Sequence, residues 1–105
     1  MLVTGYVYGM GGVEIGVKVT LIDPDTGQIQ TIVLAPGERY TVEGVQAQIE
    51  PFVIRFESYG YEPFETTVGA LIRTGTTVTL PKTNNLVPVA VLAGIIVLVW
   101  VKKKK

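Results

Sequence analysis

The chain has 105 residues, which suffice for one compact domain and a short appendage but not for two independent domains. Its nine acidic and nine basic side chains balance, yet four of the basic ones are the terminal residues Lys102, Lys103, Lys104 and Lys105. The body is therefore acidic and the tail basic, which argues against a general nucleic-acid-binding face on the folded domain. The chain contains no cysteine, so disulfides, thiolate nucleophiles and zinc-thiolate sites are excluded.

Residues 1–82 are predicted to form one domain of strands and turns throughout. Apolar and polar residues alternate with a period of two, as at Val17, Val19 and Leu21, which indicates strands with one buried face. Stretches rich in glycine, proline and aspartate separate these runs. We expect seven strands, at residues 2–8, 13–22, 28–34, 39–43, 47–57, 62–68 and 72–80. This spacing favours an all-β class, with a seven-stranded Greek-key β-sandwich or a small Greek-key barrel as the architecture.

The order of several short motifs along residues 3–80 carries a family resemblance. The motifs are Gly5–Tyr8, Val13–Asp23, Thr26–Gly27, Gly37 with Tyr40–Val42, Phe52–Phe56 and Tyr59–Pro63. In this order they resemble the carboxypeptidase regulatory-like domains, which have a transthyretin-like sandwich. The segment Gly16–Gly27 is also similar to the collagen-adhesin B-type repeats. The resemblance implies a non-catalytic scaffold or adhesive module rather than a peptidase. Residues 46–51 depart from the family's pattern, which usually has a glycine before the strand of Phe52.

The strongest single signal is the uncharged run of residues 86–101, which ends abruptly at the four lysines. At 1.5 Å per residue a helix of this length spans about 24 Å, close to the hydrocarbon core of a bilayer when lysine stems reach outward. We therefore predict a linker at 83–85, a single transmembrane helix at 86–101 and a basic tail at 102–105. The residues expected to anchor the helix are Leu86, Val87, Leu92, Ile95, Ile96, Leu98 and Trp100, with Trp100 at the interface.

Two membrane topologies are compatible with this pattern. The N-terminus alternates like a strand and lacks the basic leader and apolar stretch of a signal peptide, so we expect the C-terminal run to be the insertion signal. With the lysines on the cytosolic side, the positive-inside tendency is obeyed but the folded domain must cross the membrane. With the domain in the cytosol, four lysines must cross instead. Either way the protein is expected to be single-pass, in a cell membrane or the internal membrane of a virion.

No set of residues in the sequence is suited to catalysis. The chain has no histidine, no cysteine and no glycine-rich nucleophile turn that could complete a catalytic set with Glu57 and Glu62. Asp23 and Asp25 lie in a stretch that resembles part of a calcium loop, but the remaining acidic ligands are missing, so we interpret it as a hairpin turn. We expect neither an enzyme nor a bound cofactor or metal. Tyr59 and Tyr61 are the candidate partner-contact loop, because aromatic rings can serve as a platform for peptide or sugar.

Three functional hypotheses follow from these features. The first is a structural anchoring protein whose β-domain docks onto other protein subunits, for example a minor virion membrane protein that links a capsid to an internal membrane. The second is a cell-surface adhesion or carbohydrate-binding module. The third is an accessory subunit of a membrane transport or secretion complex that packs through its helix near Gly94. The expected partners are a lipid bilayer and other protein subunits, with weak contact of the tail to anionic lipid or nucleic acid and no small-molecule substrate.

Overall fold

The computed structural model describes residues 1–83 and is mostly β, with 47% of residues in strands and 13% in helices. This confirms the all-β class predicted from the sequence. The strands in chain order are β1 (Leu2–Gly5), β2 (Val7–Gly9), β3 (Val13–Glu14), β4 (Val17–Ile22), β5 (Ile29–Leu34), β6 (Tyr40–Glu43), β7 (Val53–Glu57), β8 (Phe64–Thr67) and β9 (Val78–Leu80). Two short helices, α1 (Gln46–Ile49) and α2 (Val68–Thr74), interrupt them.

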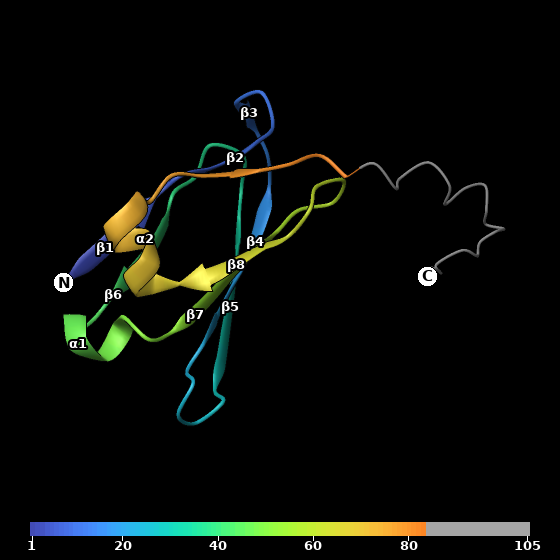
Figure 1. Cartoon of the computed structure of the whole chain (residues 1–105). Helices are drawn as coiled ribbons and strands as arrows, with labels where there is room; N and C mark the ends of the chain where they lie inside the picture. Colours follow the sequence, from blue (N-terminus) through green and yellow to red (C-terminus); the bar gives the residue numbers. More distant parts are fainter. Residues whose placement is uncertain (84–105) are drawn as a thin grey trace, which may run out of the picture.

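The strands form three sheets, of which the largest has the order β5-β4-β7-β8 and is antiparallel throughout (Figure 1). In this sheet Val19 of β4 lies opposite both Ile32 of β5 and Phe56 of β7. The second sheet pairs β1 with β6, and the third has the order β3-β2-β9, in which β2 and β9 run parallel. Because opposite residues share a face, this register gathers one apolar face on the four-stranded sheet.

Buried side chains from all three sheets and both helices form one core. The residues that are least exposed come from β4, β7, β6, α2 and β9, and they are Val17, Ile54, Phe56, Tyr40, Val68 and Leu80. The rings of Tyr40 and Phe56 meet edge to face with their centroids 5.1 Å apart. The hydroxyl of Tyr40 also donates a hydrogen bond to the carbonyl oxygen of Thr76, at 2.6 Å. Tyr40 thus ties β6 to the four-stranded sheet and to the segment before β9.

Within residues 1–83 the structure has nine strands where the sequence predicts seven, because two of the predicted strands are each divided. The predicted strand 2–8 breaks at Tyr6 into β1 and β2, which join different sheets. The predicted strand 13–22 breaks at Ile15 and Gly16 into β3 and β4, again in different sheets. The alternation of apolar residues continues across both breaks, so the sequence pattern alone does not reveal them.

The prediction of strands and turns throughout residues 1–82 is wrong at α1 and α2. In α2, Val68 and Leu71 are buried at helical spacing, and the hydroxyl of Thr67 caps the helix by accepting a hydrogen bond from the amide of Ala70 at 3.2 Å. The predicted strand 72–80 therefore begins only at Val78. The helix α1 is a single turn that buries Ile49, so the predicted strand 47–57 begins at Val53.

The predicted membrane anchor lies outside the part of the chain that the structure describes. This applies to the transmembrane helix at 86–101 with all its anchoring residues, and to the basic tail at 102–105. Across residues 1–83, the structure has no helix that is both long and apolar enough to span a bilayer.

Burial of Tyr40 predicts a measurable loss of stability in alkali. Burial raises the pKa of Tyr40 to about 12 from its ordinary value near 10. The unfolded chain releases this proton at a lower pH than the folded chain. The contribution of the protonated Tyr40 to the free energy of unfolding is therefore fully present below pH 10. It is lost as the pH rises from about 10 to about 12, on the order of 2–3 kcal/mol in all. A Tyr40→Phe variant also loses the hydrogen bond to Thr76, and is less stable by about 1–2 kcal/mol at neutral pH.

The measurement is denaturant unfolding of the full chain in mild detergent at pH 8 to 12. The difference in the free energy of unfolding between wild type and Tyr40→Phe should shrink above pH 10, because only the wild type has this proton to lose. Tyr59→Phe is the matched control, since Tyr59 is exposed and should follow the wild-type curve. Curves for wild type and Tyr40→Phe that stay parallel to pH 12 would contradict the assignment.

Candidate functional site

The candidate site is the loop of residues 58–63 between β7 and β8, called here the Tyr59 loop. Two hydrogen bonds hold its first residues in place. The hydroxyl of Ser58 donates a hydrogen bond of 2.6 Å to the carbonyl oxygen of Gly16. The amide of Tyr61 donates to the carbonyl of Ser58 at 3.1 Å, and Gly60 turns the chain with φ of +87°, a conformation that glycine adopts without strain.

The Tyr59 loop is also bonded to the last residues that the structure describes. Tyr61 forms a β-bridge with Lys82, and the amide of Glu62 donates to the carbonyl of Pro81 at 2.7 Å. The amide of Thr83 donates to the carbonyl of Gly60 at 3.0 Å. Figure 1 shows the last described residues beside this loop, at the tip between β7 and β8. The C-terminal end of the described residues is therefore held against the Tyr59 loop.

The two tyrosines that the sequence indicates as one partner-contact loop differ in their exposure. Tyr59 is 92% exposed, so its ring is available to a partner. Tyr61 is half-buried and packs against the core, and a Cβ at Gly9 would lie 2.6 Å from its ring carbon Cε1. Gly9 thus allows the ring of Tyr61 to lie directly on the backbone of β2. Tyr61 holds the loop in place, and Tyr59 is the side chain that can contact a partner.

An open pocket of about 360 Å³ lies beside the loop. The residues that line it come from β4, the end of β7 and the loop itself, and they are Lys18, Glu57, Ser58, Tyr59, Tyr61 and Pro63. Lys18 and Glu57 lie opposite each other in the register of β4 and β7, so the pocket offers one cation, one carboxylate and an aromatic ring. This combination can hold a polar peptide or sugar surface. The alternation of apolar and polar residues in the sequence predicts that Lys18 and Glu57 lie on the polar faces of their strands. It does not predict that they lie opposite each other, because that depends on the register of β4 and β7.

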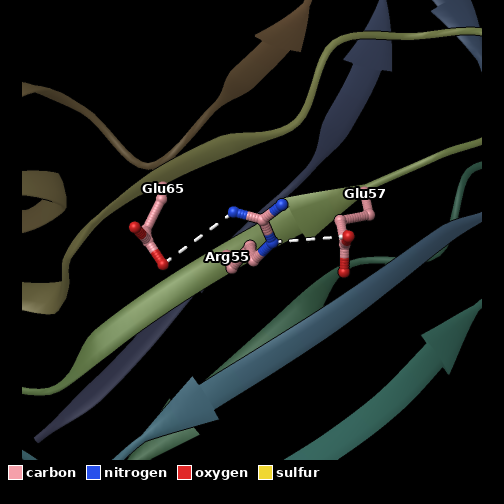
Figure 2. Close-up of polar contacts among 3 residues, drawn as sticks. All are labelled: Arg55, Glu57 and Glu65. Atoms are coloured by element: carbon pink, nitrogen blue, oxygen red, sulfur yellow. Dashed lines mark ion pairs between the residues drawn. The ribbon is translucent and has the colours of Figure 1, made fainter. Parts of the chain in front are cut away.

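Glu57, one of the two carboxylates considered for acid–base chemistry, belongs to an ion-pair network on the outer face of the sheet. Arg55 lies between two glutamates, with its Nε atom 3.3 Å from Glu57 and its Nη1 atom 3.9 Å from Glu65 (Figure 2). All three side chains are at least one-third exposed, so these pairs contribute little to stability. Glu62 comes from the loop and is not part of this network. Glu57 lines the pocket beside the loop, and Glu62 is not among the residues that line it.

The segment of Asp23 and Asp25 forms a hairpin turn, as the sequence predicts. The amide of Asp23 donates to the carbonyl of Gln28 at 2.9 Å, and the Oδ1 atom of Asp23 accepts from the amide of Asp25 at 2.9 Å. Gly27 completes the turn with φ of +75°. Over residues 1–83, histidine, cysteine and carboxylate side chains form no group of three or more that could hold a metal ion.

The different surroundings of the two tyrosines predict different effects on folding. Tyr61→Ala removes a ring that packs on Gly9 and the core, and should lower the free energy of unfolding by about 1–3 kcal/mol. Tyr59→Ala should change it by less than about 0.5 kcal/mol, because an exposed side chain loses few contacts. Thermal unfolding of the full chain, followed by circular dichroism in mild detergent, measures both. Equal losses in the two variants would contradict the separation of roles.

Comparison with protein-family models, with curated proteins and with solved structures finds no match for this chain. The resemblance to the carboxypeptidase regulatory-like domains therefore stays a prediction from the order of motifs. The described residues form a β-rich domain, in which the exposed Tyr59 and an open pocket lie near the last described residues.

Proposed function

We propose that this chain is a non-enzymatic, single-pass membrane protein whose β-domain docks onto other protein subunits. The observation that carries the proposal is the run of residues 86–101, which has no charged residue and is followed at once by Lys102, Lys103, Lys104 and Lys105. An uncharged run of this length with a basic end is typical of a transmembrane helix. The lack of histidine and cysteine in the whole sequence supports a structural role.

The sheet topology supports a Greek-key sandwich of the transthyretin-like kind. Counting each divided strand once gives seven strands, a number that supports this arrangement. The strand divided into β1 and β2 then bonds β6 through its first half and β9 through its second half. The other sheet keeps the order β5-β4-β7-β8. Two sheets that share one apolar core are the arrangement of a sandwich.

The proposal places the Tyr59 loop next to the bilayer. Thr83 is bonded to Gly60 of this loop, and only residues 84 and 85 separate Thr83 from the start of the apolar run. Three residue steps cover at most about 10 Å even in a fully extended chain. The exposed ring of Tyr59 and the side chain of Lys82 would then lie at the level of the lipid headgroups, where tyrosine and lysine are favoured. The end of the domain with α1 and the N-terminus would point toward the subunits to which it docks (Figure 1).

The basic tail fits the same arrangement on the opposite side of the membrane. Four lysines would act as a stop for insertion and attract anionic lipid headgroups or the phosphates of a nucleic acid. In a virion with an internal membrane, the β-domain would contact the capsid and the lysines would face the enclosed genome. This version accounts for the charge of the tail. The proposal includes no cofactor and no small-molecule substrate.

A second candidate function is supported by the exposed ring of Tyr59 beside the 360 Å³ pocket. A cell-surface adhesion or carbohydrate-binding module would use this ring and the neighbouring Lys18 and Glu57 to hold its ligand. It requires the domain to lie outside the cell, so protease added to intact cells should remove it. Resistance in intact cells together with cleavage in lysed cells would exclude this function and leave the docking role.

Membrane attachment can be tested by flotation of the full chain with liposomes in a density gradient. The wild type should float with the vesicles and stay bound in high salt. The double variant Ile95→Lys/Ile96→Lys should remain at the bottom, because two lysines at the centre of the run disfavour insertion by about 6 kcal/mol. The control Thr41→Lys/Thr79→Lys adds the same charge at exposed strand positions and should float. A wild-type chain that stays in the aqueous fractions would overturn the proposal.

A further inference from the structure

The strand β5 (Ile29–Leu34) is an unusual edge of the four-stranded sheet. It has no charged residue and no proline, and Ile29, Ile32 and Val33 are 61%, 47% and 77% exposed. Edge strands normally carry charges, prolines or bulges, because their free backbone groups invite pairing with another chain. The opposite edge is protected in this way: β8 contains Glu65, follows Pro63 and leads directly into α2. Strand β5 lacks all of these protections.

The hairpin between β4 and β5 determines which backbone groups of β5 face outward. The amide of Asp23 bonds the carbonyl of Gln28, so this pair is hydrogen-bonded and the pairs beyond it alternate along the ladder. Gln30, Ile32 and Leu34 then direct their amides and carbonyls toward β4. Ile29, Thr31 and Val33 direct theirs away from the sheet, toward the free edge.

In one antiparallel register, the backbone groups of Ile29, Thr31 and Val33 can pair with those of the same three residues in a second copy. Two copies of β5 related by a two-fold axis at Thr31 place Thr31 opposite Thr31, and Ile29 opposite Val33, as hydrogen-bonded pairs. Every outward amide and carbonyl of the strand then has a partner. If the two-fold axis lay at Ile32 instead, Ile29 would lie opposite Ala35. The amide of Ala35 already donates a hydrogen bond to the Oε1 atom of Glu38 at 2.8 Å. The two-fold at Thr31 is therefore the favoured register.

We propose that a second copy of this chain pairs with β5 in this register and extends the four-stranded sheet across a two-fold axis. On the outer face, each exposed Ile29 meets the exposed Val33 of the second copy, and the threonine pair at the axis continues the Thr20–Thr31 pair within each copy. On the inner face, Ile32 of the second copy lies opposite Gln30. Gln30 and Ile32 both line a cavity of about 60 Å³ at this edge of the core, so the pairing covers its mouth.

The chemistry of the strand favours a second copy over an unrelated partner. The pairing brings no charge against another charge, and it matches each exposed apolar residue with an apolar or amide side chain of the same sequence. The inference goes beyond the membrane role proposed above and does not depend on it. A six-residue strand pair buries much less surface than a standard stable interface, so the dimer is weak and is best detected by covalent trapping.

The test uses disulfide trapping of the full chain in mild detergent, because the natural sequence has no cysteine. Thr31→Cys places two thiols at the axis, where opposite Cα atoms in a hydrogen-bonded pair lie about 5.5 Å apart, within the range for a disulfide. Mild oxidation should give a covalent dimer on a non-reducing gel. Gln30→Cys is the matched control: it is exposed on the same strand, but its two copies are diagonal neighbours at about 8 Å and should give about tenfold less dimer.

A second variant tests whether the side-chain pairing drives the contact. Position 33 lies opposite Lys18 within its own sheet, so the domain should keep its fold in the Val33→Glu variant. In the dimer, the new carboxylate would lie against Ile29 of the second copy on both sides of the axis. Added to Thr31→Cys, it should reduce the covalent dimer about tenfold. Val45→Glu adds the same charge at an exposed site outside β5 and should leave the yield unchanged.

Three results would overturn the inference. Equal dimer from Thr31→Cys and Gln30→Cys would mean that the register is wrong or that the contact is random. A yield that Val33→Glu leaves unchanged would mean that β5 does not form the interface. Cross-linking in the native source to a different protein, with no homodimer, would assign the edge to another partner. Failure of the liposome flotation would not affect any of these outcomes, so the two proposals are tested separately.

Discussion

The fold depends most on the position of Tyr40, whose side chain and backbone together contact three parts of the domain. Its ring packs against Phe56 of β7, its backbone pairs with Gly5 of β1, and its hydroxyl bonds the carbonyl of Thr76 before β9. A Cβ on Gly5 would collide with the same carbonyl of Thr76, so a glycine is needed where β1 passes this segment. The buried phenol also gives the carbonyl of Thr76 a hydrogen-bond donor, and the same bond satisfies its own hydroxyl. The surrounding strands are arranged around this contact.

Alternation in the sequence predicted the β class and the approximate place of each strand, because the period of two is a local property. It could not predict the breaks at Tyr6 and Gly16, since a strand that passes from one sheet to another keeps the same side-chain period. It also missed α2, where Val68 and Leu71 lie three residues apart within a segment that ends in a strand. The cap by Thr67 was the available signal for that helix.

The candidate site was predicted only in part, for a reason that lies in long-range contacts. The sequence indicated Tyr59 and Tyr61 as equivalent members of an aromatic loop. Their separation depends on Gly9, some fifty residues earlier, whose missing side chain makes room for the ring of Tyr61. The pocket likewise joins Lys18 to Glu57 through the register of β4 and β7, which no local pattern specifies. The candidate site thus depends on tertiary neighbours, which the order of residues in a single sequence does not supply.

The two proposals, although tested separately, would strengthen each other in the cell. A weak six-residue strand pair dimerises little when the chains are dilute, but tethering to one bilayer confines them and raises their effective concentration. A short linker after Thr83 would also restrict the orientation of each domain, which lowers the entropy lost on pairing. An unprotected edge would be an aggregation hazard for a freely diffusing protein. If the proposed anchor holds the chain on a membrane, the same edge would become usable as a reversible contact, because the anchor would limit both the number and the direction of its encounters.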